Sequence, residues 1–307
     1  HIQPNQIFLR FHLFMPSQTL PCLVVAAHGR QYRVRNSQGV ILSAFTRGKK
    51  SNVACGDEVF IQKVGDSQAV IEKIRPRTSL ILRKDNTREK LIAANCTQMA
   101  IILAVEPVFS DNFLSRPLIA AHAANIQPLI VLNKIDLNCE EAKKHLEFYK
   151  LLNYKIIFLS ALKSFEAIIP FLENQKTLFL GTSGVGKSSL LNAIFKKDLR
   201  KTGELSTFSQ KGVHTTTDSQ LYFLNGKSTI IDSPGLQQFG LKHLNVNDLA
   251  NAFPEFKDYL GHCRFRNCQH LNEPNCAILC ALKNNQIQQC RYNIFKEIAE
   301  ELAKNPR

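Results

Sequence analysis

The spacing of apolar residues along the chain changes near residue 77. Between residues 20 and 77, short runs alternate apolar with polar side chains and are separated by Gly, Asn, Asp or Ser, a pattern typical of strands joined by tight turns. We predict five strands, at residues 22–26, 31–35, 40–45, 58–61 and 69–74. Five short strands favour an all-β barrel over residues 19–77, and an OB-fold is the natural candidate.

The outer face of that barrel is a candidate surface for single-stranded nucleic acid. OB-folds bind such strands through cationic and aromatic side chains, and Arg33, Arg35 and Arg47 lie near Tyr32 and Phe45 in the sequence. An ordinary solvated barrel face explains the same residues, so both interpretations stay open.

A second pattern begins near residue 94, where strands alternate with helices. Strand-like runs at 99–105, 128–132, 155–159, 177–180 and 228–231 are interspersed with helical stretches at 112–124, 140–151 and 187–195. This rhythm predicts an α/β domain over residues 78–240, with a parallel sheet and ligand loops at the carboxyl ends of its strands.

The pattern is helical again over residues 241–307. Ile287, Cys290, Ile294, Ile298 and Leu302 recur at close to the helical period, which predicts a final helix with one apolar stripe. We interpret that stripe as packing, and Cys280 and Cys290 as helix-core residues.

One loop carries a strong phosphate-binding signal. A strand runs into G-x-x-x-x-G-K-S and then into a helix, which is the context that a phosphate loop requires. Its backbone N–H groups would face the phosphates, the lysine would reach the β- and γ-phosphates, and the Ser188 hydroxyl would bind Mg²⁺. The predicted GTP-binding residues here are Gly181, Thr182, Ser183, Gly184, Val185, Gly186, Lys187, Ser188 and Ser189.

A guanine-reading motif, N-K-x-D, follows the strand at 128–132. The Asp136 carboxylate can accept from the ring N–H and the exocyclic amine of guanine, and adenine would leave that charge unpaired. Lys134 would lie along the base and Asn133 would brace the pocket. Ser160 and Ala161 fit the second guanine element. A surface turn would explain the tetrapeptide if it stood alone.

Two further segments match the nucleotide switches of GTPases. Asp232 begins a D-x-x-G motif, in which the carboxylate supports Mg²⁺ and the Gly235 N–H senses the γ-phosphate. A run of threonines follows His214, and we favour Thr216 over Thr215 as the magnesium ligand. Taken alone, the threonine run would read as the start of a strand.

The order of these motifs is rotated. The guanine readers precede the phosphate loop, whereas an ordinary GTPase runs from phosphate loop to switches to base readers. The domain is therefore predicted to be a circularly permuted P-loop GTPase. Its second switch leads directly into the C-terminal region, which suggests that nucleotide state moves that region as a body.

The residue that promotes hydrolysis is less apparent. Leu236 occupies the position where many GTPases carry a water-orienting glutamine, and an apolar side chain cannot orient water. His214 is the candidate catalytic substitute. A hinge position or an RNA contact would equally account for this histidine.

Four residues have the spacing of a structural zinc site. Cys263, Cys268, His270 and Cys276 offer three thiolates and one imidazole within a short segment, a closed set with no open position for catalysis. Buried free thiols are the alternative. Five of the nine cysteines lie between Cys263 and Cys290, and this clustering favours metal over a secreted disulfide scaffold.

The net charge of +14 favours a polyanionic partner, although a basic surface also keeps a protein soluble. No apolar run is long enough to cross a membrane, so we expect a soluble, cytoplasmic protein without a membrane or DNA partner, and a monomer by default. Residues 1–18 precede the first predicted strand, and we expect them to be a tag or a disordered leader.

Together, the rotated motif order, the phosphate loop, His214-Thr-Thr-Thr, D-S-P-G and the cysteine cluster resemble the ribosome small subunit-dependent GTPase A family. The resemblance covers the chain from about Leu20 onward. It implies an N-terminal OB-fold, a permuted GTPase and a zinc domain acting in late maturation of the small ribosomal subunit on its rRNA. It also implies that the subunit stimulates hydrolysis and that the catalytic histidine corresponds to His214.

Two functions of different class remain after these arguments. The first is an enzyme that hydrolyses GTP to GDP and phosphate on the small subunit. The second is a guanine-nucleotide-sensing RNA-binding module with negligible catalysis, which Leu236 keeps open.

Overall fold

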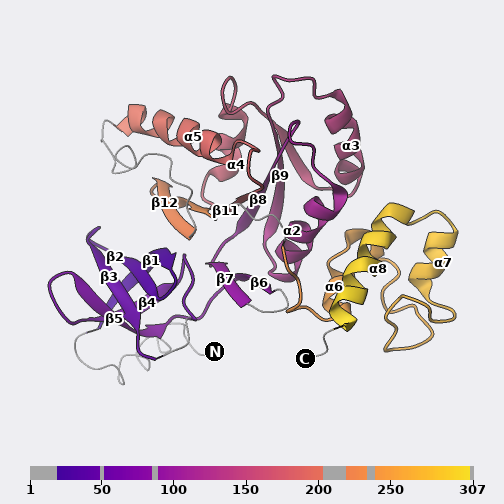
Figure 1. Cartoon of the computed structure of the whole chain (residues 1–307), viewed down its shortest axis with the longest axis horizontal. Helices are drawn as coiled ribbons and strands as arrows, with labels where there is room; N and C mark the ends of the chain where they lie inside the picture. Colours follow the sequence, from indigo (N-terminus) through magenta and orange to yellow (C-terminus); the bar gives the residue numbers. More distant parts are fainter. Residues whose placement is uncertain (1–18, 49–51, 85–88, 203–218, 234–238, 305–307) are drawn as a thin grey trace, which may run out of the picture.

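The computed structural model describes residues 19–48, 52–84, 89–202, 219–233 and 239–304. Figure 1 shows a small barrel, a central α/β region and a C-terminal helical region that flanks the central region on the side away from the barrel. The predicted fold class is confirmed, because a closed five-stranded barrel precedes the α/β region and a cysteine cluster follows it.

The barrel closes because β1 pairs with both β2 and β4. The remaining pairs are β2–β3, β3–β5 and β4–β5, of which β3–β5 is parallel. Side chains alternate between core and solvent along β2, where Tyr32 and Val34 are buried. The barrel strands are β1 Leu20–His28, β2 Gln31–Asn36, β3 Ile41–Thr46, β4 Glu58–Lys63 and β5 Gln68–Ile74.

Tyr32 is therefore not a stacking residue. Its side chain is 1% exposed and belongs to the barrel core, because alternation puts it on the face opposite Arg33. Phe45, by contrast, is 43% exposed.

The central strands are parallel in the order β10, β9, β8, β11 and β13. The antiparallel strand β12 follows, and it pairs in turn with barrel strand β1. The barrel and the central region thus share one continuous sheet. The central strands are β8 Gln98–Ala104, β9 Gln127–Asn133, β10 Lys155–Phe158, β11 Lys176–Gly181, β12 Ser219–Asn225 and β13 Ser228–Asp232.

Helices cover both faces of this sheet, and two separate apolar clusters form its core. These elements are α2 Asp111–Ala123, α3 Glu140–Leu151, η2 Glu166–Ile168, α4 Ile169–Leu172 and α5 Lys187–Thr202. A hairpin of β6 Leu80–Lys84 and β7 Glu89–Ala94 joins the barrel to the central region. This hairpin and β12 were not predicted from the sequence.

The C-terminal region packs on α2 and α3 through a buried arginine. Arg291 is 1% exposed, and its guanidinium donates to Glu255 Oε1 and to Ser115 Oγ, each at 2.5 Å. It also lies over two rings, 5.6 Å from the centroid of Tyr149 on α3 and 4.7 Å from that of Phe253. The elements of this region are α6 Val246–Asn251, η4 Pro254–Phe256, α7 Ala277–Lys283 and α8 Gln289–Ala303.

The final helix forms where the apolar stripe predicted it. Ile294 and Ile298 are buried within it. Cys280 and Cys290 are both exposed, so the interpretation of these two residues as core residues is wrong. Among the described helices, we find none with the length and apolar character that crossing a membrane requires.

Candidate nucleotide site and metal centre

The candidate nucleotide site lies at one edge of the parallel sheet. Asn133, Gly181 and Asp232 are the last residues of β9, β11 and β13. Because these strands are parallel, their carboxyl ends meet at the same edge, where open α/β sheets bind ligands. The three sequence motifs therefore converge although the guanine readers come first in the chain.

The phosphate loop has the conformation that its glycines permit. Gly184 and Gly186 have φ angles of +83° and +87°, which L side chains rarely adopt. A Cβ at Gly181 would lie 2.9 Å from the Ile102 carbonyl oxygen, and one at Gly186 would overlap the Asn133 side chain. A larger side chain at Gly181 or Gly186 would therefore displace this loop, which leads into the N-terminus of α5. Backbone N–H groups at a helix N-terminus favour anions.

Lys187 connects the phosphate loop with the predicted magnesium residue. Its ammonium contacts Asp232 Oδ1 and donates to the Ser233 carbonyl oxygen at 2.7 Å. Burial raises the pKa of Asp232, and the Lys187 charge opposes that rise. Ser188 and Ser189 are exposed at the start of α5.

Asn133 holds three loops together from a buried position. Its Nδ2 donates to the Val185 carbonyl oxygen at 2.8 Å, and its Oδ1 accepts from the Ala161 and Lys134 amides at 2.9 and 2.8 Å. The side chain is 1% exposed. Asn133 thus ties the Lys134 and Ala161 segments to the phosphate loop.

Asp136 is the residue predicted to read the guanine base. The Ser160 side chain, together with the ammonium groups of Lys163 and Lys134, holds the pKa of Asp136 below its ordinary value. Lys163 Nζ lies 3.9 Å from Asp136 Oδ2. A carboxylate that stays charged can accept both guanine donors.

The sequence interpretation missed two residues near this pocket, Glu106 and Lys163. Lys134 Nζ donates to the Glu106 carbonyl oxygen at 2.7 Å. Glu106 lies two residues beyond the end of β8, at the same sheet edge as the motifs. This position could have identified Glu106 from the sequence, because residues that follow a central parallel strand lie at the edge of the sheet that binds ligands.

Most of the two predicted switches lies outside the described residues, including His214, Thr215, Thr216, Gly235 and Leu236.

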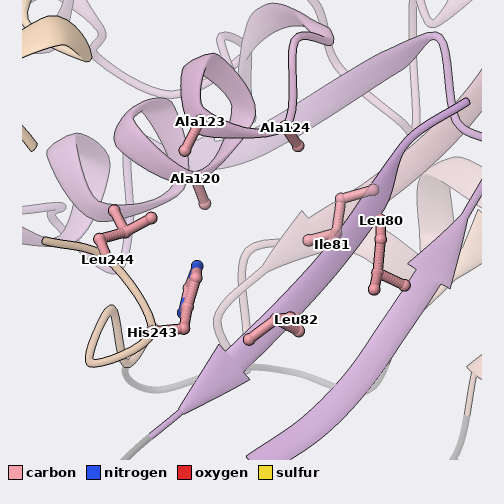
Figure 2. Close-up of a pocket in the computed structure, with 8 residues that line it drawn as sticks. All are labelled: Leu80, Ile81, Leu82, Ala120, Ala123, Ala124, His243 and Leu244. Atoms are coloured by element: carbon pink, nitrogen blue, oxygen red, sulfur yellow. The ribbon is translucent and has the colours of Figure 1, made fainter. Parts of the chain in front are cut away.

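A small cavity lies elsewhere, between β6, α2 and the segment after the second switch motif. It has a volume of about 80 Å³, and Ile81, Ala120 and Leu244 are among the residues whose side chains point toward it (Figure 2). The predicted nucleotide-binding residues do not line it. It is also smaller than the ~300–1,000 Å³ of ordinary ligand pockets.

The four predicted metal ligands do converge. Their donor atoms all lie within 4.8 Å of one another. Cys263 and Cys276 sulfurs are 3.8 Å apart, and His270 Nδ1 lies 3.5 and 3.4 Å from them. Bonds of ~2.3 Å to sulfur and ~2.0 Å to nitrogen around a tetrahedral zinc would give edges of about 3.8 and 3.5 Å. The donor set therefore fits a metal ion.

Neighbouring groups orient these ligands. The Ala277 amide donates to Cys263 Sγ at 3.4 Å, and the Tyr292 hydroxyl donates to the His270 carbonyl oxygen at 2.9 Å. Burial lowers the pKa of His270 and so favours the neutral imidazole that binds metals. Contacts of this kind, made to the ligands by neighbouring groups, are typical of metal sites in proteins.

Comparison with known proteins agrees with this geometry. Residues 74–242 match the model of a protein family described as RsgA GTPase. A protein of Nitrosospira multiformis named small ribosomal subunit biogenesis GTPase RsgA is 41% identical over 295 residues, which is 94% of either chain. This chain belongs to the RsgA GTPase family. It is accordingly a GTPase, a hydrolase.

Other matches also cover more than nine-tenths of the chain. The protein of the same name from Nitrosomonas europaea is 44% identical over 287 residues, covering 92% of this chain and 91% of the relative. The crystal structure of YjeQ from Thermotoga maritima matches with a TM-score of 0.70 at 25% identity, covering 94% of this chain and all of that one. YloQ, described as a circularly permuted GTPase, matches with a TM-score of 0.67 at 25% identity, covering 95% and 98%.

Asp136→Asn is expected to lower GTP affinity on the order of 100-fold, because an amide cannot accept both guanine donors. Xanthosine triphosphate, which presents a carbonyl where guanine has its amine, should regain affinity. Competition against fluorescent GDP measures both effects. Asp66→Asn, at an exposed barrel position, is the matched control. Equal GTP affinity in the two variants would contradict the role given to Asp136.

Proposed function

We propose that this RsgA-family GTPase binds Mg²⁺·GTP at the carboxyl edge of the sheet and hydrolyses it while bound to the small ribosomal subunit. One observation carries the nucleotide part of the proposal. The Asn133 side chain joins the phosphate loop to the Ala161 and Lys134 segments, which brings the phosphate-binding and guanine-reading motifs together. The subunit part rests on the names of the relatives, which are small ribosomal subunit biogenesis GTPases.

Each residue of the proposed site has a different role in binding. Lys187 would exchange its contact with Asp232 for the β- and γ-phosphates, and Ser188, Asp232 and Thr216 would hold Mg²⁺. Mg²⁺, when bound, neutralises negative charge on the phosphates. The Gly235 amide, by its place in the motif, would sense the γ-phosphate. The exposed start of α5 leaves Ser188 accessible to ligand.

His214 is the residue that we assign to water positioning. Leu236 cannot orient water, and His214 lies in the first switch by sequence. The proposed domain limits remain 19–77 for the barrel, 78–240 for the GTPase and 241–307 for the metal-binding region.

The partner surface is proposed to bind rRNA. Arg33 and Phe45 lie on the outer face of the barrel, both exposed, and give a cation and a stacking ring to single-stranded RNA. Arg264 lies over the ring of Phe265, 5.6 Å from its centroid, next to the metal ligands. The metal there is proposed to be one structural zinc, and the protein a cytoplasmic monomer without membrane or DNA partners.

Small ribosomal subunits are expected to stimulate GTP hydrolysis by the full chain, and His214→Ala should reduce the stimulated rate by about 100-fold or more. Released phosphate measures the rate with and without subunits. His145→Ala, at an exposed position on α3, is the control and should keep the stimulation.

Stimulation that survives in His214→Ala would remove this residue from the mechanism. Nucleotide-dependent subunit binding without any hydrolysis would favour the alternative, a guanine-nucleotide-sensing RNA-binding module.

A further inference from the structure

The barrel and the magnesium residue are connected by one row of paired residues. Ala26 of β1 pairs with Gln220 of β12, Gln220 pairs with Asp232 of β13, and Asp232 pairs with Phe179 of β11. Figure 1 shows β12 lying between the barrel and the central sheet. Only one strand, β12, thus separates barrel strand β1 from the strand that ends in Asp232.

The junction is packed as well as paired. A bulge between Val24 and Ala26 interrupts the β1–β2 register, and at a bulge successive side chains are re-aimed. Val24 is buried in the barrel core, whereas Val25 and Cys55 are buried in the core cluster of the central region. Two barrel residues, Val25 and Cys55, therefore form part of the core of the central region.

Contacts on either side of β12 strengthen this attachment. The Arg35 guanidinium lies 4.4 Å from the centroid of the Phe223 ring, which joins β2 to β12. A Cβ at Gly56 would lie 3.0 Å from Ile231 Cδ1, the residue before Asp232, and would overlap the Ala94 carbonyl. The barrel turn at Gly56 thus sits directly against β13.

Without β1, β12 would be the edge strand of the central sheet. Edge strands present unpaired backbone groups and are held less firmly than internal strands. Asp232 depends on its two flanking strands for its position, and β12 is one of them. Supporting β12 from the far side therefore fixes the carboxylate at the magnesium site.

We propose that barrel strand β1 is a positioning element of the magnesium–nucleotide site, and that the barrel and this site are thermodynamically coupled through β12. The inference rests on the proposed function, since it assigns Asp232 to Mg²⁺. The coupling acts in both directions. A ligand that orders the barrel changes the affinity for Mg²⁺·nucleotide, and Mg²⁺·nucleotide changes the affinity for that ligand by the same factor.

Val25→Ala tests the junction without touching the nucleotide pocket. The readout is the ratio of GDP affinity in Mg²⁺ to GDP affinity in EDTA, measured by fluorescence with the full chain. We expect the ratio to fall about fivefold or more, because the magnesium-dependent part of binding uses Asp232. GDP affinity in EDTA should stay unchanged.

Val34→Ala is the matched control. It removes the same two methyl groups from a residue that is also buried, but in the barrel core alone. An unchanged ratio in Val25→Ala, or an equal fall in both variants, would overturn the inference. Failure of the unaltered protein to bind GDP would instead refute the proposed nucleotide site.

Hydrogen exchange gives a second readout that does not depend on variants. On addition of Mg²⁺·GDP, peptides covering β1 should become protected together with those covering β13. Protection of β13 with unchanged β1 would contradict the coupling.

Discussion

Lys187→Ala is expected to reduce GTP turnover by about 100- to 1,000-fold, the usual cost of removing one preorganised electrostatic group. Lys187 is the buried cation of the phosphate loop, and it lies between Asp232 and the Ser233 carbonyl. An alanine there leaves the phosphate charge of the transition state without its partner. Phosphate release under saturating Mg²⁺·GTP, with small subunits present, measures the loss.

Lys196→Ala is the matched control because it removes the same charge from an exposed position on the same helix. Thermal unfolding of both variants separates a catalytic loss from a loss of fold, since Lys187→Ala also leaves Asp232 unpaired in a buried position. Turnover in Lys187→Ala close to that of Lys196→Ala would contradict the phosphate-loop assignment.

Removing the metal is expected to have the second large effect. Cys276→Ser should lower bound zinc from about one ion per chain to none, and the C-terminal region should unfold. Binding of structural zinc contributes about 10–16 kcal/mol in small metal-dependent domains, which is as large as the ~5–15 kcal/mol net stability of a typical domain. Elemental analysis gives the zinc content, and hydrogen exchange over α7 and α8 reports the unfolding.

Cys280→Ser serves as the control for this experiment, because Cys280 is an exposed thiol only four positions further along the chain. It should retain both zinc and exchange protection. Retention of a full zinc complement by Cys276→Ser, or slow exchange over α8 after the ion is lost, would contradict a closed structural site.

The contiguous motifs were predictable from the sequence because each carries its own chemistry. The phosphate loop needs Gly184 and Gly186 at positive φ, and both have it. Cys263, Cys268, His270 and Cys276 converge as their spacing predicted. The boundaries of α3 also followed directly from its periodic pattern and came out unchanged.

Pairing between distant segments was not predictable. Strand β12 follows the threonine run, and nothing in its own residues indicates that Ala26 and Ala27 of the barrel will pair with it. The burial of Arg291 has the same origin, because its partners Glu255 and Ser115 lie far away in the sequence. Local patterns report which face of an element is apolar, and they do not report what covers it.

The face of the barrel on which a side chain lies was predicted wrongly where residue type was used in place of strand alternation. Tyr32 was grouped with Arg33 and Phe45 as a stacking surface, but neighbours in a strand point to opposite faces. A separate error came from spacing, which placed Cys290 in the apolar stripe of α8, whereas the residue is exposed there. A helical period defines a broad stripe, and residues at its border can face solvent.

The central claim is that the sheet edge holding Asn133, Lys187 and Asp232 is a guanine-specific hydrolytic site. The most direct measurement is the hydrolysis of GTP and of ATP, side by side, by the full chain with Mg²⁺ and small ribosomal subunits. We predict turnover of GTP that excess ATP does not inhibit, and no turnover of ATP. Equal hydrolysis of the two nucleotides, or none of GTP, would contradict the claim.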